Sequence, residues 1–304
     1  MNKYLISVIG PTAIGKTLLG IQLAEYFNTE IISADSRQFY KEMKLGTAVP
    51  SKEELKRINH YFIQHISIKD NYNVGSFEKD AIACLNRLFQ NHDVVIMVGG
   101  SGLYIDAVIK GLDSFPKVDA KIRKELNYKL LNDGLESLQK DLQELDPKAY
   151  SAIAIDNPQR VIRALEICLG TSKPYSSFLN KKNKKRSFET ITIGLTADRP
   201  DIYTKINQRV DHMIQEGLLD EVRALDSDKH LNALNTVGYK ELFKYLNGTW
   251  SLEFAISEIK KNTRRFAKRQ LTWFRKNEDI VWFNNNIDVQ NIIDVIEDQI
   301  KKPA

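Results

Sequence analysis

The segment GPTAIGKT (10–17) has the residue types and the spacing of a phosphate-binding loop. Its glycines let the backbone bend so that successive N–H groups point at an anion, and a helix that starts here adds its positive end. Lys16 supplies a point charge, and the Thr17 hydroxyl is a suitable ligand for Mg²⁺. The sequence therefore predicts a di- or triphosphate ligand held by Gly10, Pro11, Thr12, Ala13, Ile14, Gly15, Lys16 and Thr17.

A second residue suited to chemistry, Asp35, directly follows the apolar run EIISA (30–34). An Asp in this position can be a metal ligand, a general base or a helix cap, and its spacing leaves all three open. Nucleotide-hydrolysing proteins with such a phosphate loop usually hold Mg²⁺ with an Asp at the end of another strand. Here the run VVIMV (94–98) ends in Gly-Gly-Ser-Gly (99–102), with no carboxylate. This difference argues against a standard NTPase.

Composition excludes several other classes of protein. The two cysteines, Cys84 and Cys168, are too few for a disulfide framework or a Cys-based zinc site, and we expect a reduced, cytoplasmic compartment. We expect His60 to be structural, and the remaining histidines show no metal-ligand spacing. No run of about 20 apolar residues indicates a membrane span. The apolar amino terminus leads into the phosphate loop rather than into a cleavage site.

Short β-branched runs alternate with helical patterns in the first 112 residues. We expect strands at 4–9, 30–34 and 94–98, and helices at 16–27 and 76–90. This alternation predicts a parallel sheet covered by helices. Open α/β sheets bind ligands beyond the carboxyl ends of their strands, which is where the phosphate loop and Asp35 would lie.

The pattern changes from about residue 113. Helical patterns follow one another without a strand, at 119–131, 134–145 and 158–169, and Asn157-Pro158 marks a helix start. The basic run KKNKKR (181–186) follows, and its composition predicts a mobile loop or hinge. Beyond it we expect a strand at 191–195, helices at 201–224, 237–246 and 251–275, a strand at 280–283 and a final helix. We therefore expect one α/β core, residues 1–112 and 190–304, interrupted by an all-helical insertion, residues 113–189.

The net charge of +5, from 44 Lys and Arg against 39 Asp and Glu, hides a strongly basic helix at 260–276. That helix has eight Lys or Arg residues and no Asp or Glu. Lys260, Arg264 and Lys268 recur every four residues, as do Lys261, Arg265 and Arg269, whereas Ile259, Phe266 and Trp273 have core spacing. Such a face is often merely solvated, but uncompensated cations repel one another unless an anion binds. The alternative is a surface that contacts RNA phosphates.

Six segments occur together in a characteristic order: GPTAIGKT (10–17), ADSRQFY (34–40), GTAVP (46–50), GGSGLY (99–104), NPQRVIRALE (157–166) and AKRQLTWFRK (267–276). In this order the chain resembles the tRNA dimethylallyltransferases, or tRNA isopentenyltransferases, from its first strand to about residue 284. The resemblance implies a P-loop NTPase-like core and transfer of a dimethylallyl group from dimethylallyl diphosphate to N6 of the adenine just 3′ of a tRNA anticodon. The phosphate loop would then hold the isoprenoid diphosphate with Mg²⁺, which accounts for the missing Asp.

The resemblance also implies roles for single residues. Asp35 would be the general base for the adenine amine, while Lys16 and Arg209 would stabilise the leaving diphosphate. Ser101 replaces the Thr of the family's GGTGLY and keeps the hydroxyl that would contact the target nucleotide. With the basic helix included, the residues expected to contact tRNA are Asp35, Ser36, Arg37, Gln38, Ser101, Arg123, Gln159, Arg160, Arg163, Val237, Gly238, Tyr239, Lys240, Lys268, Arg269, Trp273 and Arg275.

A tRNA substrate would be an anticodon stem-loop, clamped by the helical insertion, with the target adenine extruded toward Asp35. The resemblance suggests a monomer. Three alternatives stay open at the sequence level. A related enzyme prenylates free adenine nucleotides. A phosphate-loop kinase or NTPase would need the missing carboxylate and a base pocket. A non-catalytic RNA-binding regulator would bind tRNA without transfer.

Overall fold

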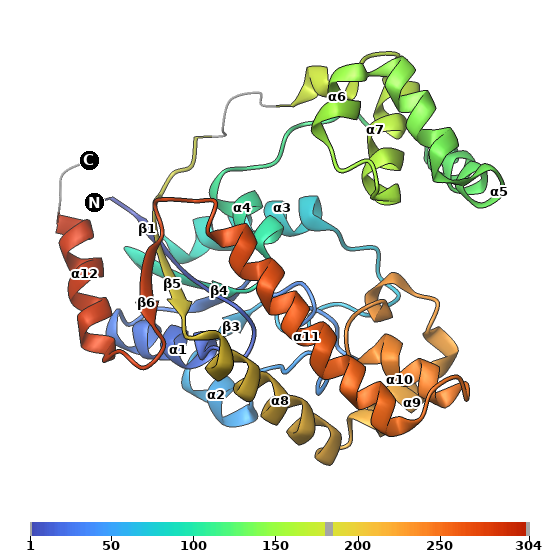
Figure 1. The fold of residues 1–304 in the computed structure, drawn as a ribbon. Coiled ribbons are helices and arrows are strands. Elements are labelled where there is room, and N and C mark those ends of the chain that lie inside the picture. Colours follow the sequence, from blue (N-terminus) through green and yellow to red (C-terminus); the bar gives the residue numbers. More distant parts are fainter. Residues whose placement is uncertain (1, 180–184, 302–304) are drawn as a thin grey trace. The chain divides into compact units, whose positions relative to one another are not determined.

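The computed structural model describes residues 2–179 and 185–301. The chain divides into two compact units, one formed by residues 1–110 and 186–304 and the other by residues 111–185 (Figure 1). The first unit contains a parallel sheet with helices, and the second is helical. The predicted fold class, a P-loop NTPase-like α/β core with an inserted all-helical domain, is confirmed.

Within the described residues, six parallel strands form one sheet in the order β3-β2-β4-β1-β5-β6. Their bounds are β1 Tyr4–Ile9, β2 Ile31–Ser33, β3 His60–Tyr61, β4 Val94–Gly99, β5 Glu189–Thr196 and β6 Val281–Asn284. Every residue of β1 is buried, as expected for a parallel sheet covered on both faces. Sequence analysis missed β3 because a two-residue strand has no periodic pattern.

The register of the three central strands brings their carboxyl ends to one edge. Ile9 of β1 pairs with Gly99 of β4, and the backbone N–H of Ala34, just past β2, donates to Val98 O at 2.7 Å. A Cβ on Gly99 would lie 2.5 Å from Ala34 O, so only glycine allows this close approach. The phosphate loop, Asp35 and Ser101 therefore start from neighbouring positions.

Alternate residues of β1 face two helical layers. Ile6 and Val8 pack in a cluster with α1 (Lys16–Tyr26), α8 (Arg199–Gln215) and α12 (Val289–Lys301). Leu5 and Ile9 face a second cluster with α3 (Val74–Leu88) and α4 (Gly102–Ile109). The helix α11 (Leu252–Phe274) contributes Ala267 to the first cluster and Phe274 to the second. It therefore packs against both layers (Figure 1).

A third cluster joins the amino-terminal half of α11 to the end of α8 and to α9 (Leu218–Ala224) and α10 (Tyr239–Leu246). The single helix expected at 201–224 is wrong, because Gly217 adopts a left-handed φ of 99° and separates α8 from α9. The remaining elements of this unit are α2 (Lys52–Arg57) and the 3₁₀ turns η2 (Asp226–Asp228) and η3 (Asn232–Leu234).

The helical unit consists of α5 (Ala120–Leu145), α6 (Pro147–Ala152), α7 (Pro158–Thr171) and the 3₁₀ turn η1 (Tyr175–Phe178). Gly134, with a φ of 78°, interrupts α5 where two separate helices were expected. Asn157 caps α7 by accepting the backbone N–H of Gln159 at 3.0 Å, as the Asn-Pro pair predicts. The predicted basic run at 181–186 lies outside the described residues except for 185 and 186. Of the helices described, none has the length and apolar character that a membrane span requires.

Candidate active site

The phosphate loop has the backbone shape that anion binding requires. Gly10 has a φ of 147° and Gly15 a φ of 107°, and a Cβ on Gly10 would lie 2.6 Å from Leu195 O. Gly15 is the N-cap of α1 and brings no capping side chain, so the first turn of the helix presents its N–H groups to a ligand. The loop can therefore hold a phosphate group at the positive end of α1.

Three charged groups act on one another beside this loop. Lys16 donates from Nζ to Pro11 O at 2.7 Å. Burial lowers the pKa of Lys16 to about 8; Asp35 opposes this shift and the positive charge of Arg209 reinforces it. Burial also lowers the pKa of Arg209, again opposed by Asp35. Two partly buried cations thus share one carboxylate, and an anionic ligand would supply the missing negative charge.

Asp35 lies in a turn joined to the Ser101 loop. Its Oδ1 accepts the backbone N–H of Arg37 at 3.1 Å, and Ser101 Oγ accepts the N–H of Ser36 at 3.0 Å. The hydroxyls of Ser36 and Ser101 lie 3.1 Å apart. The loops after β2 and β4, which the sequence separates by some 65 residues, therefore hold Asp35 and Ser101 together.

A cavity of about 470 Å³ opens at this edge of the sheet. Thr12, Asp35, Ser101 and Arg209 form part of its wall, and its apolar wall residues include Val210, Met213, Leu218, Ile259 and Phe266. The volume lies in the usual range for small-molecule sites. A charged region beside an apolar one suits a ligand that has an anionic head and a hydrocarbon body.

The segment 44–48 forms another part of the wall and is held by residues that the sequence did not reveal. The Glu221 carboxylate accepts the backbone N–H groups of residues 44, 45 and 46 at 2.8 to 3.1 Å, and the Tyr239 hydroxyl at 2.6 Å. Gln38 donates from Nε2 to Ala48 O at 2.8 Å. The expected tRNA contact does not fit the side chain of Tyr239, which is fully buried and supports this loop instead.

The chemistry of the phosphate loop also bears on Mg²⁺. Thr17 lies in the first turn of α1, next to Lys16. Among the described residues, no three His, Cys, Asp or Glu side chains gather into a metal site. Mg²⁺ prefers few protein ligands together with substrate phosphate oxygens, so one hydroxyl beside a phosphate site fits this ion.

Comparison with known proteins decides the family. A sequence model described as IPP transferase matches residues 38–277. The chain is 62% identical over 300 residues to the tRNA dimethylallyltransferase of Christiangramia forsetii, and the match covers 99% of each chain. The chain belongs to the IPP transferase family.

Solved structures agree with this assignment. The tRNA isopentenylpyrophosphate transferase of Bacillus halodurans is 37% identical, with a TM-score of 0.71 and coverage of 99% of this chain and 96% of that one. A eukaryotic dimethylallyltransferase described as acting on tRNA is 25% identical, with a TM-score of 0.86 and coverage of 99% and 80%. Membership of the family makes this chain a prenyl-transferring enzyme and confirms the resemblance on which the sequence analysis relied.

In this IPP transferase, α11 departs from the expected core pattern. Phe266 and Trp273 are each 37% exposed and line the cavity, so their predicted core positions are wrong. The buried positions of α11 are instead Ala255, Ile259, Ala267, Gln270 and Phe274. Trp273 donates from Nε1 to Asp106 Oδ2 at 2.8 Å, which holds the indole at the cavity rim. An apolar row at helical spacing can face a cavity as well as a core.

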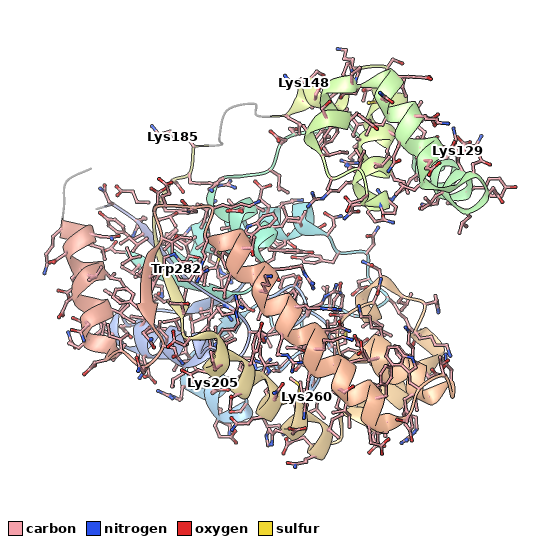
Figure 2. All side chains as sticks on the ribbon, in the orientation of Figure 1. Lys129, Lys148, Lys185, Lys205, Lys260 and Trp282 are labelled. Atoms are coloured by element: carbon pink, nitrogen blue, oxygen red, sulfur yellow. The ribbon has the colours of Figure 1, made fainter. Side chains whose placement is uncertain are left out.

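The cations of α11 divide into two groups. Lys260, labelled in Figure 2, forms an ion pair with Asp211 at 2.6 Å, and Lys261 pairs with Glu258. The prediction that all eight cations lack acidic partners is therefore wrong, because α8 and the start of α11 supply acids. Five basic residues further along remain exposed to solvent: Arg265, Lys268, Arg269, Arg275 and Lys276. The basic surface is thus concentrated toward the carboxyl end of the helix.

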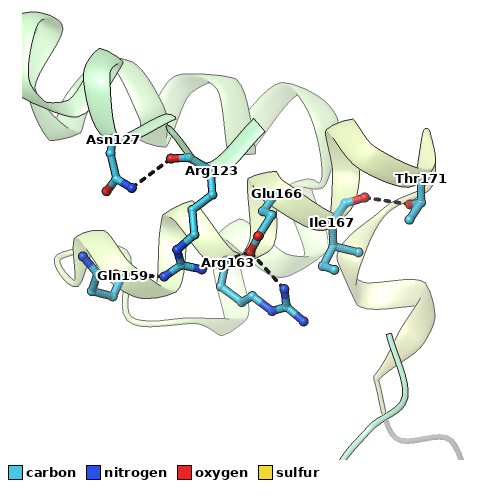
Figure 3. Close-up of polar contacts among 7 residues, drawn as sticks. All are labelled: Arg123, Asn127, Gln159, Arg163, Glu166, Ile167 and Thr171. Carbon is cyan, nitrogen blue, oxygen red and sulfur yellow. Dashed lines mark hydrogen bonds and ion pairs between the residues drawn. The ribbon is translucent and has the colours of Figure 1, made fainter. Parts of the chain in front are cut away.

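The helical unit carries its own basic cluster, shown in Figure 3. Buried Glu166 accepts hydrogen bonds from Arg123 at 3.1 Å and Arg163 at 2.9 Å, and Arg123 also donates to Gln159 Oε1 at 3.1 Å. The side chains of both arginines remain about two-fifths exposed. Arg160 is exposed. The helical unit holds four of the residues expected to contact tRNA, and three of them, Arg123, Gln159 and Arg163, share this hydrogen-bond network. The network fixes two guanidinium groups that stay partly exposed to solvent.

Proposed function

We propose that this IPP transferase moves the dimethylallyl group of dimethylallyl diphosphate to N6 of the adenine 3′-adjacent to the anticodon in tRNA. The observation that carries the proposal is the electrostatic interaction of Asp35 with Lys16 and Arg209 beside the phosphate loop, at a cavity that Asp35 and Arg209 line. Such an arrangement suits a base and a diphosphate-binding group that act at one cavity, which supports the proposal. The names of the relatives, tRNA dimethylallyltransferases, support tRNA as the substrate.

The phosphate loop, Lys16 and Arg209 act on the leaving group. Negative charge gathers on the diphosphate as its bond to the allylic carbon breaks, and N–H groups and cations already in place stabilise that charge without reorganisation. Thr17 would hold Mg²⁺ together with diphosphate oxygens, and the ion would neutralise part of the same charge. The apolar cavity wall leaves room for the hydrocarbon part of the substrate.

Asp35 acts on the nucleophile. The lone pair of an exocyclic adenine amine is delocalised into the ring, so the amine is a poor nucleophile while it keeps both protons. N6 forms a bond to the allylic carbon, the bond from that carbon to the diphosphate oxygen breaks, and an N6 proton passes to the Asp35 carboxylate. Ser101 and Ser36, whose hydroxyls meet beside Asp35, would orient the adenosine.

The tRNA would be held by phosphate contacts that do not depend on its sequence. The exposed cations of α11 and the arginines around Glu166 are suited to this role. The adenine must leave its stack in the anticodon loop to reach Asp35. A substrate of this size accounts for the basic surfaces better than a free nucleotide does.

The proposal is tested by offering the purified protein labelled dimethylallyl diphosphate, Mg²⁺ and either unmodified tRNA or AMP. We expect label in tRNA, at adenosine by nucleoside mass analysis, with far slower transfer to AMP. Equal rates with AMP would instead assign the protein to the nucleotide-prenylating enzymes. ATP hydrolysis without use of dimethylallyl diphosphate would support a kinase or NTPase.

A further inference from the structure

The amide of Gln270, on α11, joins two loops of the active site. Its Oε1 accepts the backbone N–H of Thr12 at 2.9 Å, and its Nε2 donates to the backbone carbonyl of Gly100 at 2.9 Å. An N–H can only donate and a carbonyl can only accept, so the two partners fix the orientation of the amide. One side chain thus connects the phosphate loop after β1 with the loop after β4.

The position of Gln270 is rigid. Its side chain is only 6% exposed, and Ala267 and Phe274, one turn away on either side, are buried in the two core clusters. A Cβ on Gly100 would lie 2.3 Å from Gln270 Nε2, so the glycine leaves the space that the amide needs. A buried polar side chain with both ends satisfied at this cost in space indicates a specific function.

The two loops serve opposite ends of the reaction. The Thr12 loop would hold the diphosphate, and Gly100 directly precedes Ser101, whose hydroxyl meets Ser36 beside Asp35. In-line attack requires that the leaving group and the amine keep a fixed separation. On the basis of the proposed function, Gln270 lies where it can set that separation.

We propose that Gln270 is a positioning residue that fixes the phosphate loop relative to the Ser101–Asp35 side of the site. It touches no reacting atom and acts through Thr12 and Gly100. Replacing its amide with a group that cannot satisfy both loops leaves each loop folded but lets their spacing vary. The expected loss lies mainly in kcat, with a smaller loss of diphosphate affinity because the Thr12 loop is no longer held at a fixed distance from Gly100.

The test uses Gln270→Glu, which keeps the size of the side chain but, when ionised, cannot donate to Gly100 O. We expect kcat for tRNA prenylation to fall about a hundredfold relative to the wild type at pH 8.5. The deficit should shrink at pH 6, because burial beside a carbonyl oxygen raises the pKa of the new carboxyl, and the protonated form can donate. Gln270→Asn, one methylene shorter, should lose activity equally at both pH values.

The control is Gln90→Glu, the same charge change at an exposed position beyond α3, which should match the wild type. Thermal unfolding and the affinity for inorganic diphosphate are measured for every variant without tRNA. Gln270→Glu that matches the wild type in kcat and diphosphate affinity would overturn the positioning role, as would a loss that does not change with pH. A wild type that binds diphosphate but transfers nothing to tRNA would contradict the proposed function, while the positioning role would still be judged from diphosphate affinity.

Discussion

The protonation state of Lys16 depends on its surroundings in the site. Burial of the ammonium lowers its pKa to about 8. The negative charge of Asp35 opposes this shift, and the positive charge of Arg209 adds to it. In the absence of a ligand, part of the Lys16 population is therefore neutral under mildly alkaline conditions. An anion bound at the phosphate loop would favour the charged form and draw a proton onto the site.

This coupling predicts a pH-dependent affinity for inorganic diphosphate. Lys16 is charged below pH 8 and loses its proton above it, so the affinity should fall as pH rises from 7 to 9, by up to about tenfold per unit above 8. Binding at pH 9 should take up a proton, which calorimetry in buffers of different ionisation enthalpy detects. Since diphosphate itself titrates, Lys16→Met is the reference, and a wild type with the same pH dependence as this variant contradicts the coupling.

Some site residues could be identified from the sequence and others could not. Lys16 and Thr17 belong to a contiguous motif, and Asp35 follows a buried strand, so local pattern was enough to find them. Glu221 and Gln270 act on backbone groups far away in the chain, in the segment 44–46 and at Thr12 and Gly100. No local pattern encodes such a contact, because it exists only once the helices have packed.

Individual elements show the same limit. The apolar strands and most helices follow from periodicity. Periodicity does not predict which face of α11 is buried in the core, because its apolar row at Phe266 and Trp273 lines a cavity. The break between α8 and α9 falls at Gly217, which has a left-handed φ of 99°. A glycine inside a helical pattern destabilises the helix but is tolerated there, so it does not by itself mark a helix end.

Replacing Gly10, the first residue of the phosphate loop after β1, should destabilise the protein. Gly10→Ala adds a Cβ 2.6 Å from Leu195 O at a φ of 147°, so the chain must shift as well as bear backbone strain. We expect a loss of about 3 kcal/mol in unfolding free energy, together with loss of diphosphate binding. Gly248→Ala is the matched control. It has a φ of 78° and open space around its Cβ, and should cost only about 1 kcal/mol. Equal effects in the two variants would contradict the proposed close contact.

The division of cations along α11 gives a second prediction at this scale. Lys268→Gln removes an exposed charge and should weaken tRNA binding while lowering the salt slope by about one unit. Lys260→Gln removes a charge already paired with Asp211 and should change tRNA affinity little. Binding isotherms at several salt concentrations measure both variants. The reverse order of effects would place the RNA surface at the other end of the helix.

At the scale of the whole molecule, we propose that the reaction uses the first unit alone and that recognition of RNA uses basic residues of both units. The first unit holds the cavity and the groups assigned to chemistry. The helical unit holds the arginine network around Glu166 and the exposed Arg160. In the proposed function a tRNA substrate would use both units, whereas a free nucleotide would need only the first.

Arg160→Gln tests this requirement. The change should raise KM for tRNA severalfold, because one phosphate contact is lost, and leave kcat and KM for dimethylallyl diphosphate unchanged. Slow transfer to AMP, where it can be measured, should be unaffected. Steady-state kinetics with each substrate provide the comparison. An unchanged KM for tRNA would exclude Arg160 from the RNA surface.

The central claim is that Asp35 accepts the proton of the adenine amine in a tRNA prenyl transfer. The most direct measurement is single-turnover transfer to unmodified tRNA by the wild type and by Asp35→Asn, with nucleoside mass analysis and tRNA affinity measured in parallel. Asn can still accept the Arg37 N–H, so the turn should persist. We expect N6-dimethylallyladenosine from the wild type, a rate about one hundredth of the wild-type rate or less in the variant, and nearly equal tRNA affinity. A variant as fast as the wild type, or a wild type that forms no modified adenosine, would contradict the claim.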